Sequence, residues 1–126
     1  MQNPYEKYKQ QSVMTMTQGD MVKLLFEEAV KQLERGTGCI KNKDIPGSND
    51  ALQRAQKIFN HLLSTLDQQY EIAGSLASLY EFFNYKIIQA NIKKDPRELE
   101  DILPMIIELK DTFAQADKQA RIQQNG

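Results

Sequence analysis

The sequence predicts an all-α fold, an antiparallel four-helix up-down bundle with an N-terminal arm. Only six Gly and four Pro occur in 126 residues, and the dominant residues, among them Leu, Gln, Lys, Glu and Ala, lose little rotamer freedom in a helix. Four long segments repeat apolar side chains at i, i+3, i+4 and i+7, and none shows sustained period-two alternation. Short breaks between the segments favour antiparallel neighbours.

The first helix is expected over residues 17–42. Thr17 is a candidate N-cap, and Asp20, three residues later, complements the helix dipole. Gly36 and Gly38 fall inside this helix; we interpret them as a weak turn or a close helix approach, with a hinge as the alternative. The predicted core stripe is Val22, Leu25, Phe26, Ala29, Leu33, Gly36 and Ile40.

The second and third helices are expected over residues 48–67 and 71–93. Ser48 is the predicted N-cap of the second helix, after a break at residues 44–47. The second stripe is Ala51, Leu52, Ala55, Ile58, Phe59, Leu62, Leu63 and Leu66. The third stripe is Ile72, Leu76, Leu79, Phe83, Ile87 and Ala90.

The fourth helix is expected to open at Asp95-Pro96-Arg97-Glu98, where Asp95 caps the helix and Glu98 reaches back to close a capping box. Pro104 falls inside it and predicts a kink. Its stripe is Leu99, Ile102, Leu103, Ile106, Leu109, Lys110 and Phe113, apolar except for the lysine. The predicted bundle spans residues 17–118, and residues 119–126 are expected to form a frayed polar tail.

Residues 1–16 form the predicted N-terminal arm. Five of them are apolar or aromatic, too many for a simple solvated tail, so the arm is expected to dock on the bundle. These five are Tyr5, Tyr8, Val13, Met14 and Met16.

Charge and composition exclude several function classes. The chain has 16 Lys+Arg against 17 Asp+Glu and a net charge of −1, which argues against a dedicated nucleic-acid binder. One Cys cannot form an internal disulfide. No apolar run suits a signal peptide or approaches the ~20 residues of a membrane helix, which predicts a cytoplasmic protein with no membrane insertion.

The titratable residues predict neither a catalytic nor a metal site, and no cofactor. His61 falls opposite its core stripe and is expected on the surface, and Cys39 is expected to act as a small buried hydrophobe. The acidic cluster from Asp95 to Asp101 is assigned to helix capping and the helix dipole. The chain is therefore predicted not to be an enzyme.

Surplus apolar surface points to binding. Tyr85, Ile88 and Ile92 form a second apolar line opposite the core stripe of the third helix, where a bundle helix is normally polar. Met105 and Ile107 widen the apolar arc of the fourth helix. Either the arm or a neighbouring helix covers the second apolar line, or a partner segment docks there. The two readings are compatible, because a partner can displace the arm.

These residues resemble those of the flagellar export chaperone family FliS over residues 3–116. Order and spacing carry the resemblance, since no single piece is diagnostic. The matching pieces are Asn3-Pro4-Tyr5 with Tyr8 and Val13, Met21 to Ala29 (Met-Val-Lys-Leu-Leu-Phe-Glu-Glu-Ala), Ser64-Thr65-Leu66-Asp67, Leu79-Tyr80, Ala90-Asn91, and Leu109-Lys110-Asp111-Thr112-Phe113.

The resemblance implies a non-enzymatic chaperone that binds the disordered C-terminal segment of flagellin, prevents premature polymerisation and delivers the subunit to the export gate. It implies a four-helix bundle whose arm occupies part of the binding surface. The chain departs from the family at Phe113, where Trp is common, and at Pro104. The predicted partner-binding residues are Tyr5, Tyr8, Val13, Leu79, Tyr80, Phe83, Tyr85, Ile88, Asn91 and Ile92. The resemblance places four of them near the binding surface or its support: Leu79, Tyr80, Phe83 and Asn91.

Two further partner hypotheses stay open. An export-gate component or a regulator is a candidate second partner. The alternative function is a homodimeric structural or adaptor protein that buries the same surface against itself and has no client.

Overall fold

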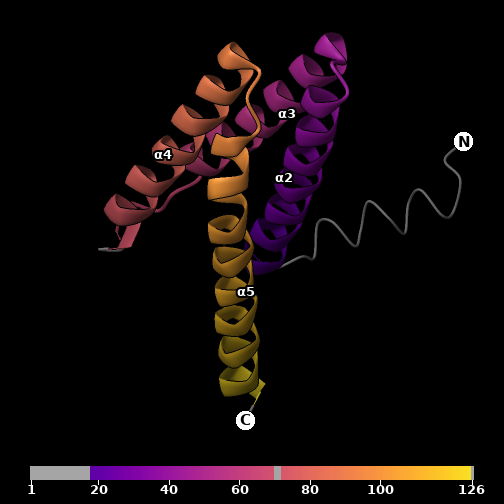
Figure 1. Cartoon of the computed structure of the whole chain (residues 1–126). Helices are drawn as coiled ribbons and strands as arrows, with labels where there is room; N and C mark the ends of the chain where they lie inside the picture. Colours follow the sequence, from indigo (N-terminus) through magenta and orange to yellow (C-terminus); the bar gives the residue numbers. More distant parts are fainter. Residues whose placement is uncertain (1–17, 70–71, 126) are drawn as a thin grey trace, which may run out of the picture.

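The computed structural model describes residues 18–69 and 72–125, and these residues form a bundle of four α-helices (Figure 1). The helices are α2 (Gln18–Lys41), α3 (Ile45–Ser64), α4 (Ile72–Lys93) and α5 (Arg97–Asn125). No strand occurs among these residues. The predicted all-α bundle is confirmed, whereas the N-terminal arm and the Thr17 cap lie outside the described residues.

Each helix packs against the helices before and after it, and α5 closes the bundle against α2. The α2–α3 pair shares the most extensive contact, and the α4–α5 pair shares the least. Figure 1 shows α4 and α5 running apart from the loop that joins them. The bundle is therefore tight along α2 and α3 and opens between α4 and α5.

An aromatic cluster fills the centre of the core. The ring of Tyr80 from α4 lies 6.1 Å from Phe26 of α2 and 6.0 Å from Phe59 of α3, measured between centroids. Phe83 and Phe113 extend the cluster, at 5.4 Å from Phe59 and 5.7 Å from Phe26 respectively. Such aromatic pairs contribute about 0.5–1.5 kcal/mol each beyond their buried area. The cluster thus joins all four helices.

Most of the predicted stripe residues lie in the core or pack against it, but the stripe of α4 was incomplete. Tyr80 and Ala73, which the sequence analysis did not place in that stripe, are 1% and 3% exposed. Ile72, which the stripe included, is 61% exposed. The fully enclosed residues with less than 1% exposure include Phe26, Ala29, Leu33, Leu52, Ala55, Phe59, Phe83, Ile87, Ala90, Ile102 and Ile106.

Gly36 lies where α2 packs directly against Leu52 of α3. A Cβ atom at Gly36 would fall 2.6 Å from Leu52 Cδ2, whereas a Cβ at Gly38 would meet nothing within 4 Å. Both glycines keep ordinary helical backbone, since no glycine of the described residues has a positive φ. The close-approach interpretation is confirmed for Gly36.

The predicted start of α3 at Ser48 is wrong, because Asp44 caps the helix instead. The Gly47 backbone N–H donates to Asp44 Oδ1 at 3.0 Å, and α3 begins at Ile45. Pro46 fits in the first turn, where its missing N–H costs no hydrogen bond. Ser48 is buried inside the helix and donates its hydroxyl to the Ile45 carbonyl at 2.9 Å. The helix also ends at Ser64, before the predicted Asp67.

The predicted capping box at the start of α5 does not form. The Arg97 backbone N–H donates to Asp95 Oδ1 at 3.0 Å, while the Asp95 N–H donates to the Ala90 carbonyl. Glu98 pairs instead with Lys93, with 3.6 Å between Oε1 and Nζ. Hydrogen bonds from the Arg97 side chain and backbone lower the pKa of Asp95 to about 2. Asp95 therefore caps the start of α5 as predicted, whereas Glu98 does not.

The C-terminal boundary also differs from the prediction. The structure continues α5 to Asn125 and keeps it one helix through Pro104, whereas a frayed tail was expected over residues 119–126. Residues 114–125 include Ala, Lys, Gln and Arg but no Gly or Pro, so helix propensity alone favours continued propagation. A kink at Pro104 stays a prediction.

The two glycines of α2 provide a matched stability test. Gly38→Ala is expected to raise the free energy of unfolding by about 0.5–1 kcal/mol, because alanine loses less backbone entropy in a helix. Gly36→Ala is expected to lower it by about 1 kcal/mol, because the same added Cβ would fall 2.6 Å from Leu52 Cδ2 and overpack the helix contact. Urea unfolding followed by circular dichroism measures both; equal effects at the two positions would contradict the close approach.

The Asp95–Arg97 contact predicts a pH dependence. Because the pKa of Asp95 is lower in the folded chain than its usual value, the contact stabilises the fold above the usual pKa and is lost as the pH falls toward 2. Asp95→Asn should therefore lower the thermal midpoint at pH 7 and change it little at pH 2. A midpoint difference that stays constant across this range would exclude the proposed contribution.

Candidate functional site

The predicted second apolar line is exposed on α4. Tyr85 is 58% exposed, Ile88 is 38% exposed and Ile92 is 72% exposed. None of the three belongs to the buried core, which Ala73, Leu76, Tyr80, Phe83, Ile87 and Ala90 supply from the same helix. Helix α4 therefore has apolar side chains on two faces, as predicted.

Apolar exposure extends from this line toward α5. Phe82 is 39% exposed on α4, with Lys86 Nζ 5.7 Å from its ring centroid. Met105 of α5 is 45% exposed, whereas Ile107 is half-buried. Exposed apolar residues thus occur on both of the helices that diverge from each other.

Three of the predicted partner-binding residues lie in or against the core. Tyr80 and Phe83 are buried members of the aromatic cluster, and Leu79 is half-buried and packs against the core. Because they are buried, these three residues support the exposed surface of α4 from beneath. The Tyr80 hydroxyl is an exception, since it points into a cavity. Of the other predicted residues, Tyr5, Tyr8 and Val13 lie outside the described residues.

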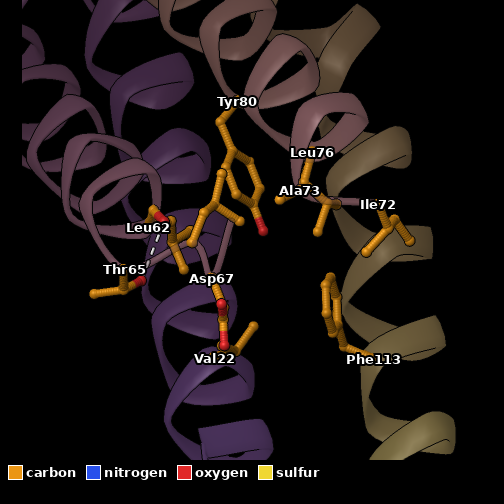
Figure 2. Close-up of a pocket in the computed structure, with 10 residues that line it drawn as sticks. Val22, Leu62, Thr65, Asp67, Ile72, Ala73, Leu76, Tyr80 and Phe113 are labelled. Atoms are coloured by element: carbon orange, nitrogen blue, oxygen red, sulfur yellow. Dashed lines mark hydrogen bonds between the residues drawn. The ribbon is translucent and has the colours of Figure 1, made fainter. Parts of the chain in front are cut away.

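A cavity of about 180 Å³ lies beneath Tyr80, between the diverging helices (Figure 2). We call it the Tyr80 cavity. Figure 2 shows the Tyr80 hydroxyl pointing into it, with Phe113 on the opposite side. Its lining residues come from all four helices and the segment after α3: Val22, Leu62, Thr65, Leu66, Asp67, Ile72, Ala73, Leu76, Tyr80 and Phe113.

The Tyr80 hydroxyl is the polar group deepest in this apolar site. Burial raises the pKa of Tyr80 to about 12, so the phenol stays neutral at physiological pH. Thr65 and Asp67 are exposed, and each already makes a local hydrogen bond: the Thr65 hydroxyl donates to the Leu62 carbonyl, and Asp67 Oδ1 accepts from the Gln69 N–H. The interior of the cavity can therefore hold an apolar group. The oxygens of Thr65 and Asp67 remain at its edge as hydrogen-bond acceptors.

Asn91 holds the C-terminal end of α4 rather than standing free. Lys94, which has a φ of 52° just after the helix, donates its ammonium to Asn91 Oδ1, Asn49 Oδ1 and Ser48 Oγ. This Lys94 cluster ties the end of α4 to the first turn of α3. Contact between Asn91 and a partner stays a prediction.

The titratable residues of the described segments gather no catalytic or metal-binding constellation. His61 is exposed, as predicted, and Cys39 is half-buried and unpaired. Among the described residues, no group of three or more His, Cys, Asp or Glu side chains could hold a metal ion. None of the described helices is long and apolar enough to cross a membrane.

Sequence reasoning missed the Tyr80 cavity and the Lys94 cluster. The cavity depends on how four helices diverge, and no local pattern encodes that divergence. The cluster joins Ser48 to Lys94 across two helices, which periodicity does not reveal. The Asp44 cap did have a local signal, an Asp two residues before Pro46, where proline favours the first turn of a helix.

Comparison with known proteins identifies relatives along the full chain. Residues 1–120 match the family described as "Flagellar protein FliS". The chain is 31% identical over 126 residues to the flagellar secretion chaperone FliS of Bacillus subtilis (strain 168), covering 100% of this chain and 95% of that protein.

Two other bacteria supply further relatives. The flagellar secretion chaperone FliS of Vibrio cholerae is 31% identical over 121 residues, covering 91% of this chain and 89% of that protein. The Salmonella typhimurium protein of the same name is 26% identical over 117 residues, covering 90% and 87%.

The Lys94 cluster makes a stability prediction with a built-in control. Lys94→Met should lower the free energy of unfolding by about 1–3 kcal/mol, because partly buried acceptors lose their donor. Lys43 has a similar φ of 59° after α2, but no hydrogen bond or ion pair of the described residues uses its ammonium group. Lys43→Met should therefore change stability by less than about 0.5 kcal/mol; equal losses in chemical denaturation would contradict a role for the cluster.

Proposed function

The chain belongs to the FliS family, and on this premise we propose that it is a flagellar secretion chaperone that binds the C-terminal segment of flagellin. The relatives named above support the chaperone role. The structural observation that carries the proposal is the second apolar line on α4, which the bundle core leaves exposed. By keeping the segment bound, the chaperone prevents premature polymerisation and delivers the subunit to the export gate.

The physical requirements of such a client agree with this surface. A disordered segment loses conformational entropy when it orders on a partner, so the complex needs a large apolar contact to offset that loss. Exposed aromatic and aliphatic side chains on α4 supply part of that contact. The net charge of −1 offers little overall electrostatic attraction, so apolar burial is the main source of affinity.

We further propose that the chaperone acts in the cytoplasm and that its role is non-enzymatic, a role that membership of the family supports. We also propose that the N-terminal arm, residues 1–16, docks on the bundle and covers part of the apolar surface until the client arrives. Tyr5, Tyr8 and Val13 are the arm residues proposed to make these contacts.

Further partners follow from the same premise. A component of the export gate, or a regulator of flagellar assembly, is the proposed second partner, because a client must be passed on after binding. A homodimer through the second apolar line would compete with the client for the same residues. Sedimentation at several concentrations, with and without client, distinguishes these two uses of the surface.

Co-expression with the flagellin of the same organism tests the proposal directly. The chain should co-purify with full-length flagellin as a defined complex and should not retain flagellin that lacks its C-terminal segment. Equal recovery of both flagellins, or of neither, would contradict the proposed client.

A charge placed in the second apolar line should weaken binding. Ile88→Glu is expected to reduce affinity for the flagellin segment about tenfold or more, since burying a large aliphatic side chain stabilises a complex by about 1.5–3 kcal/mol. Ile122→Glu is the matched control, because Ile122 is 60% exposed on a different helix. Calorimetric titration of both variants measures the difference; unchanged affinity for Ile88→Glu would remove this line from the site.

A further inference from the structure

We propose that the Tyr80 cavity receives one apolar side chain of the client, of leucine, methionine or phenylalanine size, as the anchor of the bound segment. This inference rests on the proposed function and adds to it the place where one client side chain inserts. Binding along the second apolar line does not by itself require a client side chain to insert into the bundle.

The size of the cavity fits a single side chain. Its volume is about 180 Å³, and an apolar cavity of about 150 Å³ accommodates a benzene molecule. A leucine, methionine or phenylalanine side chain is of that size. The volume excludes a whole helix or strand, so the backbone of the client stays at the rim.

The walls and the rim of the cavity differ in chemistry. Leu62, Leu76, Ala73 and Phe113 make the interior apolar, and the Tyr80 hydroxyl is the polar group that points inward. The carboxylate of Asp67 lies at the exposed edge and joins no ion pair of the described residues. An apolar side chain of a peptide suits this arrangement, because the peptide's backbone N–H groups next to that side chain can donate to the Asp67 carboxylate at the rim.

An exposed apolar path on α4 connects the cavity to the second apolar line. Ile72, on the cavity wall, is 61% exposed, and Phe82 is 39% exposed. At 3.6 residues per turn, Phe82 lies about 80° round the helix from Ile72, and Tyr85 lies about 60° further in the same direction. A segment that starts in the cavity can therefore follow apolar side chains to Ile92 without crossing the core.

The span of this path argues for a long partner segment. Ile72 and Ile92 are about 30 Å apart along a helix that rises 1.5 Å per residue. A small apolar molecule would fill the cavity but leave the path exposed. A client segment fills both, which is why we assign the cavity to the client.

Filling the cavity tests the proposal in the full-length chain. Ala73→Met adds a side chain at the cavity wall, and Gln53→Met places the same side chain at an exposed position of α3, outside the cavity and off the path on α4. Titration with a synthetic C-terminal flagellin segment should show affinity reduced about tenfold or more for Ala73→Met, and within about twofold of the parent for Gln53→Met.

The outcomes separate this inference from the proposed function. If the parent chain binds the segment and Ala73→Met binds equally well, the anchor is wrong and the function stands. If the parent chain does not bind the segment, both are wrong. Circular dichroism and the thermal midpoint of each variant establish that it is folded before the affinities are compared.

A second measurement tests occupancy without enlarging any side chain. Ala73→Cys, in a chain carrying Cys39→Ala, places a single thiol in the cavity, and its reaction with methyl methanethiosulfonate is followed by mass spectrometry. Bound client should slow the reaction about tenfold or more. A rate that the client leaves unchanged would overturn the proposal.

Discussion

The contact of Tyr80 with Phe26 and Phe59 is the interaction on which the bundle depends. It joins α4 to α2 across the core and to α3 beside it, at centroid distances of 6.1 and 6.0 Å. Among the packed pairs, helices α4 and α5 share the least contact. Tyr80 attaches α4 to α2 and α3, and Phe113 attaches α5 to α2 through Phe26. Because the aromatic rings set the position of α4, they also set which of its side chains remain exposed.

The position of α4 has two consequences for binding. Its outer face keeps Tyr85, Ile88 and Ile92 exposed, and its first turn stands far enough from α5 to leave the Tyr80 cavity. The opposite end is held by the Lys94 cluster. A rigid helix with one fixed end and one open end presents a preorganised apolar path, which lowers the entropy cost on the chaperone side of binding.

Local sequence patterns predicted the four helices, the exposure of His61 and the second apolar line, because apolar periodicity reports which faces of a helix are buried. They offered a close helix approach as one of the interpretations of Gly36, which the structure supports. They misplaced the start of α3, because Asp44 competes successfully with Ser48 as the cap once Pro46 occupies the first turn. They left Tyr80 out of the core stripe of α4, and the family resemblance placed it near the binding surface or its support, because the core and the surface of a wide apolar arc cannot be divided without knowing where the neighbouring helices lie.

In the proposed function, affinity comes from burying apolar surface of a disordered flagellin segment along α4. Calorimetric titration of the C-terminal flagellin segment at a series of temperatures tests it most directly, since apolar burial gives a negative heat-capacity change on binding. The account predicts one segment bound per chain, with a large negative heat-capacity change and little dependence on salt. Binding with a heat-capacity change near zero and a steep salt dependence would contradict it.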